Sequence, residues 1–302
     1  MIKLPNGINI VCLIDDLRIF SWEAADVLLH YSQILTGSDN KDNLIKSKGD
    51  NDPVTAADLS VNSLIINRIN NKYPLADWVI VSEENVKPND PIYDQYSDWL
   101  WLFDPLDGTK DFIQGTGNYA MHLSLNYKNN PYLGFVLIPG KEELWITNGS
   151  KTWCEDRKGQ NKFLSTSLGK NLNQMRLVMS KNHKNEYLKN LVDHIPFSKI
   201  ENMGSIGCKI ASLIRGDNDI YISLSIPNGS CPKDWDFAAP QAILKNAGGD
   251  ITTLENEDLI YNKENFLQGG IIIATNCKKN HKLICEQIKS VVLENNLLPF
   301  YS

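Results

Sequence analysis

A run of bulky apolar residues that ends in two carboxylates constrains the fold of this chain more than any other feature. Residues 99–103 read Trp-Leu-Trp-Leu-Phe and carry no helical spacing, which predicts a strand buried on both faces. Asp104 and Asp107 follow at its end. Because Pro105 fixes its own φ and disfavours helical backbone in the residue before it, Asp104 is expected to stay extended and aimed out of the sheet.

Oxygen atoms suited to a hard cation gather at this strand end. Asp104 and Asp107 offer two carboxylates with the Leu106 carbonyl between them, a ligand set that suits Mg²⁺. Gly108 permits a sharp turn or a positive φ, which leaves the amides of residues 108–110 free to face an anion. An Asx-type turn that closes a core strand is the alternative, since Asp-Gly is a common turn dipeptide. The segment therefore predicts either a combined metal and phosphate site or a plain turn.

A second pair of carboxylates ends another candidate strand. Residues 78–81 (Trp-Val-Ile-Val) are typical of a short buried strand, and Ser82, Glu83 and Glu84 follow it. A Glu-Glu pair is usually solvated surface. This pair lies about twenty residues before Asp104, a separation that allows two adjacent strands to deliver acids to one edge of a sheet.

A further acidic segment precedes a helix. Residues 37–51 are polar and predict a loop or hairpin, and Asp52-Pro-Val-Thr55-Ala-Ala-Asp58 then leads into a helical pattern that stops at Tyr73. On these residues alone, Asp52 and Thr55 are helix-capping residues, and Asp58 is a first-turn carboxylate stabilised by the helix dipole. Only in combination with the other segments does Asp58 gain a catalytic interpretation.

The remaining patterns indicate two lobes. Apolar residues keep a helical period from 13 to 35, and residues 118–148 alternate as an antiparallel meander. The polar segment 151–170 is interpreted as irregular, which places the lobe boundary there and gives an N-terminal lobe of residues 1–165 and a C-terminal lobe of residues 166–302. In the second lobe we expect strands at 177–179, 220–222, 250–254 and 271–274, and helices at 237–246 and 281–293.

Charge and cysteine usage narrow the function classes. The 302 residues include 30 basic and 36 acidic side chains, a net charge of −6, which argues against nonspecific nucleic-acid binding. A polyanionic substrate would need metal ions to offset the protein's own carboxylates. The six cysteines are scattered without a C-x-x-C pair, which favours reduced thiols in a cytoplasmic protein. Residues 1–16 lack the basic flank and cleavage site of a signal peptide, and no apolar run reaches membrane-spanning length.

Four separated stretches occur in one order along the chain. They are Asp52-Pro-Val-Thr-Ala-Ala-Asp58, Ser82-Glu83-Glu84, residues 101–109 (Trp-Leu-Phe-Asp-Pro-Leu-Asp-Gly-Thr), and Trp235-Asp236-Phe-Ala-Ala-Pro240 with Ala247-Gly-Gly249. Together they resemble the signatures of the inositol monophosphatase superfamily of Mg²⁺-dependent phosphatases. The resemblance implies an α/β fold, a layered αβαβα sandwich of the inositol monophosphatase and fructose-1,6-bisphosphatase type.

The same resemblance implies a site for two or three Mg²⁺ ions. Its ligands would be Glu83, Asp104, Asp107, Asp236 and the Leu106 carbonyl. Several carboxylates at one sheet edge repel one another unless divalent cations neutralise them, so these residue types fit that role.

A water-activating group is also implied by the resemblance. Thr109, hydrogen-bonded to Asp58, would orient the attacking water, and Glu83 would polarise the same water through its metal. Metal-assisted in-line displacement at phosphorus is the reaction that such a site performs.

Within the superfamily the chain is similar to the 3′(2′),5′-bisphosphate nucleotidase (CysQ-like) branch. The cues are Lys110 after Gly-Thr, Ser180 with His183 three residues on, and Lys209 in a glycine- and serine-bearing loop. The residues expected to contact the substrate are Gly108, Thr109, Lys110, Ser180, His183, Ser205 and Lys209.

The implied reaction is hydrolysis of the 3′-phosphate of adenosine 3′,5′-bisphosphate to AMP and phosphate, which recycles a by-product of sulfate assimilation and is inhibited by Li⁺. The partner is then a small phosphorylated nucleotide, and the chain is a monomer or homodimer. Two alternatives are an inositol or sugar monophosphatase on the same scaffold, and a metal- or phosphate-binding regulatory protein without activity. The presence of all four acidic ligands argues against the second alternative.

Overall fold

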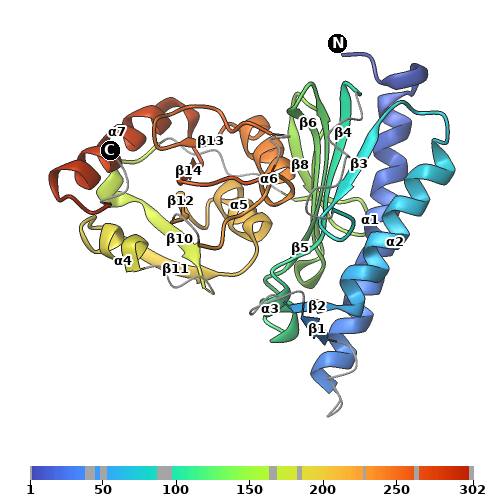
Figure 1. Cartoon of the computed structure of the whole chain (residues 1–302), viewed down its shortest axis with the longest axis horizontal. Coiled ribbons are helices and arrows are strands. Elements are labelled where there is room, and N and C mark those ends of the chain that lie inside the picture. Colours follow the sequence, from blue (N-terminus) through green and yellow to red (C-terminus); the bar gives the residue numbers. More distant parts are fainter. Residues whose placement is uncertain are drawn as a thin grey trace.

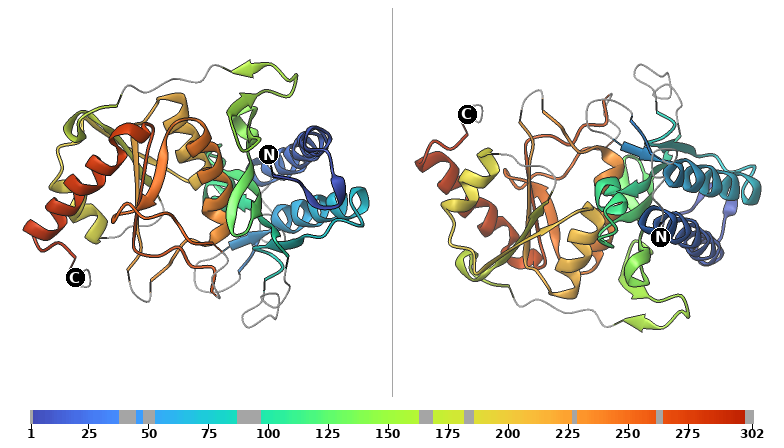
Figure 2. Two further views of the ribbon diagram at one scale, coloured as in Figure 1. Left: turned by 90° about the horizontal axis from the view of Figure 1, so that it is seen from above. Right: turned by 90° about the horizontal axis from the view of Figure 1, so that it is seen from below.

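Five layers of helices and sheets build the molecule (Figure 1). The computed structural model describes residues 2–37, 45–47, 53–86, 97–162, 169–181, 186–226, 229–261 and 265–298. The layers follow one another along the long axis: a helix pair, a seven-stranded sheet, a second helix pair, a five-stranded sheet and a third helix pair. Views from above and below show the same succession (Figure 2). The predicted αβαβα sandwich is therefore confirmed.

The first layer is formed by α1 (Ile10–Gly37) and α2 (Ala56–Lys72). A short 3-10 turn, η1 (Pro5–Gly7), precedes α1, and the antiparallel pair of β1 (Ile45–Ser47) and β2 (Pro53–Thr55) lies between the two helices in the sequence. Apolar residues along one side of each helix pack against the large sheet, which confirms the helix predicted at 13–35. No helix in the described ranges is long and apolar enough to span a membrane.

The large sheet contains the strand predicted at residues 99–103. Its strands run in the order β3-β4-β5-β6-β7-β8-β9, with β3 and β4 parallel and the other neighbours antiparallel. The strand bounds are β3 (Val79–Ser82), β4 (Trp99–Asp107), β5 (Ala120–Tyr127), β6 (Asn130–Ile138), β7 (Glu143–Thr147), β8 (Thr152–Glu155) and β9 (Asn161–Lys162). Two short turns of helix, α3 (Thr109–Ile113) and η3 (Pro139–Lys141), follow β4 and β6. The expectation that two neighbouring strands deliver acids to one edge is confirmed.

Segment 151–170, predicted to be irregular, in fact contains β8 and β9. The polar residues of this segment hid the strand pattern. One of them, Glu155, is buried in the strand, because it accepts a hydrogen bond of 2.6 Å from Arg18 Nε of α1. Thr152 is buried as well, and its hydroxyl donates to the Ile243 carbonyl at 2.7 Å. Partners from other layers therefore allow polar residues in this strand.

The smaller sheet has the order β11-β10-β12-β14-β13, in which β10 is parallel to both β11 and β12, and β14 is antiparallel to its neighbours. Its strands are β10 (Arg176–Ser180), β11 (Lys199–Met203), β12 (Ile220–Leu224), β13 (Asp250–Thr253) and β14 (Ile271–Thr275). The helices of this half are α4 (Glu186–Asp193), α5 (Ile206–Arg215), α6 (Asp234–Asn246) and α7 (Lys278–Glu294), with a 3-10 turn η4 (Leu172–Gln174) before β10. Two elements were not predicted from the sequence, the polar edge strand β11 and the short helix α4.

The middle layer joins the two sheets through a shared core. One hydrophobic cluster contains Leu102 and Trp145 of the large sheet, Phe237 of α6, and Val178 and Ile272 of the small sheet. The outer helices α4 and α7 cover the far face of the small sheet with a separate cluster. The division into lobes at residue 165 remains a prediction, and the helices α5 and α6 that lie between the sheets position the site.

Candidate active site

Three carboxylates from two layers meet at the end of β4. Asp104, Asp107 and Asp236 each offer an oxygen, and these oxygens all lie within 4.8 Å of one another. Asp104 and Asp107 belong to β4, whereas Asp236 lies in the first turn of α6. Asp236 comes at least 129 residues after the other two carboxylates in the sequence. It shares one small volume with them because α6 packs against β4.

A change of register lets both β4 carboxylates face the middle layer. Leu102 packs on that face, and Asp104 continues the same alternation. The pairing with β5 shifts between Asp104 and Asp107, so that Leu106 instead packs toward the outer helices. Asp107 then points to the same side as Asp104, as a β-bulge re-aims the residues that follow it. Asp104 is also fixed by a turn of its own, since its Oδ1 accepts from Leu106 N at 2.9 Å.

Asp236 is held by the helix start that carries it. Its Oδ2 accepts a hydrogen bond of 2.6 Å from the backbone N–H of Lys233, the residue before α6. A carboxylate in the first turn of a helix is favoured by the helix dipole. The local sequence Lys-Asp-Trp-Asp therefore contributes to the placement of Asp236 at the start of α6.

Glu83 lies close to these acids. Its backbone N–H donates to the Phe103 carbonyl at 3.0 Å, which ties it to β4 one residue before Asp104. The negative charge of Glu83 raises the pKa of both Asp104 and Asp236. Glu83 thus adds a fourth carboxylate to the electrostatic field of the site.

Burial and mutual repulsion disfavour the charged forms of this cluster. Both effects raise the pKa of Asp104 well above its ordinary value, burial being the larger cause, and the same two causes act on the pKa of Asp236. A divalent cation would remove this penalty by replacing carboxylate repulsion with attraction. The donors are all oxygen, the type of ligand that Mg²⁺ takes. The residues present therefore fit a magnesium site.

The remaining carboxylate, Asp107, receives donors from the start of α5. Its Oδ2 accepts from Ser205 Oγ at 2.7 Å, from the Ile206 backbone N–H, and from Gly207 N at 3.3 Å. A helix N-terminus presents free N–H groups and a partial positive charge, so it is a suitable partner for a carboxylate. The middle layer is thereby tied to the end of β4.

The expected hydrogen bond between Thr109 and Asp58 is not formed in this structure. Thr109 Oγ1 instead donates to the Leu106 carbonyl at 3.2 Å. Asp58 Oδ2 accepts from Thr55 N at 2.7 Å and from Thr55 Oγ1 at 2.6 Å, the capping arrangement that the sequence allowed. Thr109 and Asp58 nevertheless lie on neighbouring elements, because α3, which begins at Thr109, packs against β2, which ends at Thr55 just before α2.

Asp58 is buried, and burial raises its pKa to about 6, with Glu84 adding a smaller repulsion. A carboxyl group with such a pKa exchanges its proton near neutral pH, as a general base must. The geometry therefore leaves a catalytic role for Asp58 as a prediction.

Gly108 adopts a left-handed conformation, one of the two that the sequence allowed, with φ at 87°. A Cβ there would come within 3.1 Å of Ser205 N, so the glycine also permits the close approach of Ser205, the N-cap residue of α5. α3 begins at the next residue, and Lys110 of this turn is half-buried.

The other expected substrate contacts occupy mixed positions. Ser180 is half-buried at the end of β10, and Ser205 is buried beside Asp107. Lys209 is 3% exposed; its Nζ donates to the Gly204 carbonyl at 3.0 Å and lies over the Tyr221 ring. His183 falls outside the described residues, as does Asp52. The structure thus places Ser205 at the N-cap of α5 and Lys209 within this helix.

Two residues near the site were missed from the sequence. His122 of β5 is fully buried, and its Nε2 lies 3.3 Å from Asp107 Oδ2. Lys181 directly follows Ser180, and its Nζ donates to Gln114 Oε1 at 2.8 Å and lies 3.8 Å from Asp111 Oδ1. A histidine within the alternating pattern of residues 118–148, and a lysine at a strand end, were the available signals.

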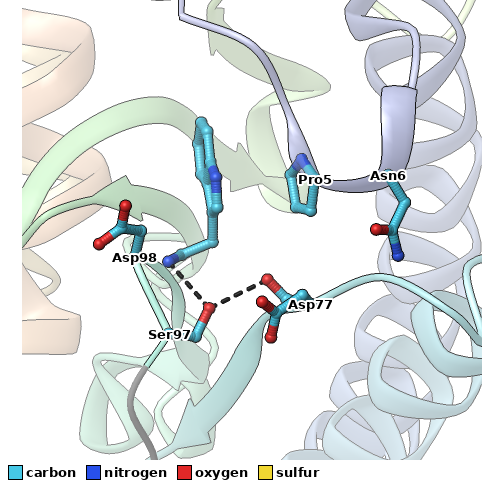
Figure 3. A pocket seen from close by; sticks show the side chains of 6 residues that line it. Pro5, Asn6, Asp77, Ser97 and Asp98 are labelled. Carbon is cyan, nitrogen blue, oxygen red and sulfur yellow. Dashed lines mark hydrogen bonds between the residues drawn. The ribbon is translucent and has the colours of Figure 1, made fainter.

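A hollow at the other end of β4 is separate from the acidic cluster (Figure 3). Ser97 lies within it, with its Oγ donating to the Asp77 carbonyl at 3.0 Å and accepting from Trp99 N at 3.1 Å. β4 begins at Trp99 and ends at Asp107, so the whole strand lies between this hollow and the cluster.

Comparison with known proteins decides how this arrangement is to be classified. Residues 17–293 match the model of the inositol monophosphatase family. The chain belongs to this family. Members of the inositol monophosphatase family are metal-dependent phosphatases, and the acidic cluster at the end of β4 is the part of this chain that suits a metal.

Relatives within the family include bisphosphate nucleotidases. The 3′(2′),5′-bisphosphate nucleotidase CysQ of Buchnera aphidicola is 31% identical over 232 residues, which cover 75% of this chain and 82% of that protein. The protein of the same name from Escherichia coli K12 is 27% identical over 265 residues, 87% of this chain and 99% of that protein.

Solved structures of the inositol monophosphatase family share the fold. The Thermotoga maritima IMPase has a TM-score of 0.73 at 21% identity, covering 93% of this chain and 98% of that one. CysQ from Bacteroides thetaiotaomicron has a TM-score of 0.68 at 23% identity, covering 87% and 98% of the two chains. These likenesses support the layered architecture.

Proposed function

We propose that the protein is a Mg²⁺-dependent 3′(2′),5′-bisphosphate nucleotidase that hydrolyses the 3′-phosphate of adenosine 3′,5′-bisphosphate to AMP and phosphate. The observation that carries the phosphatase part is the convergence of Asp104, Asp107 and Asp236 on one cluster that suits divalent cations. The choice of substrate is supported by the CysQ relatives, which carry this activity in their names. The reaction would recycle a by-product of sulfate assimilation.

In this proposal the carboxylates hold the metal cofactor. Asp104, Asp107 and Asp236, with Glu83 and the Leu106 carbonyl, would hold two or three Mg²⁺ ions. When bound, Mg²⁺ acidifies water and neutralises the charge of a phosphate group. The carboxylates fix where that chemistry takes place.

Asp58 and Thr109 orient the attacking water. Thr109 Oγ1 must turn from the Leu106 carbonyl, to which it now donates, toward Asp58. Asp58, whose pKa of about 6 leaves it mostly ionised at neutral pH, then accepts the hydroxyl proton of Thr109, so that Thr109 accepts from the water. Glu83, whose charge acts on Asp104 and Asp236, would hold a metal ion on the same side as that water.

The scissile phosphate meets backbone amides. Gly108 has no side chain, and the N–H groups of Gly108, Thr109 and Lys110 at the start of α3 are the donors assigned to that phosphate. The second phosphate and the ribose are assigned to Ser180, His183, Ser205 and Lys209.

The test is a comparison of two substrates. Purified protein with Mg²⁺ is expected to release phosphate from adenosine 3′,5′-bisphosphate with a higher kcat/KM than from inositol 1-phosphate, and Li⁺ is expected to inhibit. Faster turnover of inositol 1-phosphate would assign the protein instead to the inositol or sugar monophosphatases. Absence of turnover on both, with Mg²⁺ bound, would indicate a regulatory protein.

A further inference from the structure

A buried histidine lies directly behind the acidic cluster. His122 is paired with Asp104 in the register of β4 and β5, and its side chain is on the face that meets the middle layer. Its ring has no exposed surface, and Nε2 lies 3.3 Å from Asp107 Oδ2. The backbone of Trp235, which precedes Asp236 in α6, is also near the ring. His122 therefore lies between the end of β4 and the start of α6.

The first turn of α5 is built around this ring. A Cβ on Gly207 would overlap His122 Nε2 and lie 2.7 Å from Val136 Cγ1. Gly207 is in α5, where a glycine costs about 1 kcal/mol relative to alanine. The absent side chain makes room for the imidazole, so the helix and the histidine fit one another.

The donors around Asp107 all gather on one of its two oxygens. Ser205 Oγ, Ile206 N and Gly207 N donate to Oδ2, and His122 Nε2 approaches the same atom. Among the described residues no hydrogen bond is made to Oδ1. A carboxylate anchored by one oxygen keeps the other for a cation, and outer partners of this kind fix the orientation of a metal ligand.

We propose that His122 is a positioning residue for Asp107: together with the start of α5 it holds Oδ2, so that Oδ1 faces the cation cluster. The inference rests on the proposed function, because it requires Asp107 to bind a metal ion. A purely structural role for His122 would also explain its burial, but it would not link the imidazole to metal affinity. Among the described residues, both ring nitrogens of His122 are buried without a hydrogen-bond partner, which is costly, and Nε2 lies 3.3 Å from Asp107 Oδ2. The position beside a metal ligand gives this imidazole a role.

The experiment measures Mg²⁺ binding to the folded protein by isothermal titration calorimetry, without substrate. His122→Leu removes the ring nitrogens, and His122→Gln keeps a donor. We expect His122→Leu to weaken Mg²⁺ binding about 10- to 100-fold, the usual effect of losing an outer partner, and His122→Gln to recover part of that loss. The Mg²⁺ concentration that gives half-maximal activity should rise in parallel.

His281→Leu is the matched control. His281 is likewise buried, but it lies in α7, where its ring contacts Thr252 Oγ1 at 2.8 Å and Thr275 Oγ1 at 2.9 Å. Its loss is expected to lower the melting temperature and leave the Mg²⁺ affinity unchanged. An equal loss of Mg²⁺ affinity in the two variants would attribute the effect to general destabilisation and overturn the inference.

Gly207→Ala keeps the test decisive if His122→Leu does not fold. The added methyl group displaces the imidazole without removing it, and the same loss of Mg²⁺ affinity is expected. Wild-type affinity in folded His122→Leu or in Gly207→Ala contradicts the inference while the phosphatase assignment stands. Failure of the wild-type protein itself to bind Mg²⁺ would instead contradict the proposed function.

Discussion

Ser205 Oγ donates a hydrogen bond of 2.7 Å to Asp107 Oδ2, although 98 residues separate the two in the sequence. The same hydroxyl accepts from Cys208 N at 3.2 Å and so caps α5. One side chain therefore fixes both a helix start and a carboxylate of the candidate metal site. The position of the middle layer and the geometry of the site depend on each other.

Ser205→Ala is expected to destabilise the protein and loosen the site together. Loss of a helix N-cap costs about 1 kcal/mol of unfolding free energy, and loss of the donor leaves Asp107 less firmly oriented. Urea unfolding and Mg²⁺ titration measure the two effects. Ser198→Ala is the control, because Ser198 Oγ bonds the Gln174 carbonyl in another part of the fold. An unchanged Mg²⁺ affinity in Ser205→Ala would show that the Ser205 hydroxyl caps α5 without influencing metal binding.

Asp236→Asn is expected to lower Mg²⁺-dependent kcat/KM more than about 100-fold. This loss exceeds the one that is typical when a hydrogen-bond partner of a metal ligand is removed. The substitution should also stabilise the metal-free protein at pH 8. Burial and repulsion raise the folded-state pKa of Asp236, so the folded protein binds protons that the unfolded chain releases, and stability falls as pH rises through that pKa. The neutral amide avoids this loss.

Melting curves in a chelator from pH 8 downward test the point. The gap between Asp236→Asn and the wild type should shrink as the pH falls, because Asp236 becomes protonated. Added Mg²⁺ should raise the melting temperature of the wild type more than that of the variant. A variant that is less stable than the wild type at pH 8, or that retains activity, would remove Asp236 from the ligand set.

Activity is expected to rise with pH through about 6. Asp58 has its pKa raised to about 6 by burial, and only its ionised form accepts a proton from Thr109. Asp58→Asn should lower kcat about 100-fold or more, within the range of general-base contributions, and remove this acidic limb. The pH profile of kcat/KM measures it, with Thr109→Ser expected to keep activity and Thr109→Val to lose it. An acidic limb that persists in Asp58→Asn would assign it to another group.

Lys209→Ala is expected to weaken binding of the bisphosphate about tenfold or more while changing binding of a monophosphate little. A charge-assisted hydrogen bond to phosphate contributes about 1.5–3 kcal/mol, and the Lys209 ammonium lies beside the loop that carries Ser205. Lys189→Ala on α4 serves as the control. Equal losses for both ligands would show that Lys209 does not distinguish the second phosphate.

Local sequence was enough to locate most of the site. The apolar run of β4, the Asp-Pro-Leu-Asp-Gly segment and the parallel partner β3 were predictable because burial, proline geometry and glycine conformation act over a few residues. The convergence of Asp236 with Asp104 and Asp107 was implied only by family resemblance, since no local rule links residues so far apart.

The errors share a physical cause. β8 was missed because Glu155 is polar, and its burial depends on Arg18 from another layer. The role suggested for His122 depends on the first turn of α5, which lies beside it only in the folded chain. The Thr109–Asp58 contact was expected from the family and is replaced here by the Thr55 cap. Contacts between distant segments are what single-sequence patterns do not contain.

The most direct test of the central claim is anomalous diffraction from crystals soaked in Mn²⁺, a cation that accepts the same oxygen ligands as Mg²⁺. The account predicts Mn²⁺ peaks bounded by Asp104, Asp107 and Asp236, and their loss in Asp236→Asn. Mn²⁺ bound elsewhere on the protein, with these three carboxylates uncoordinated at saturating concentration, would contradict it.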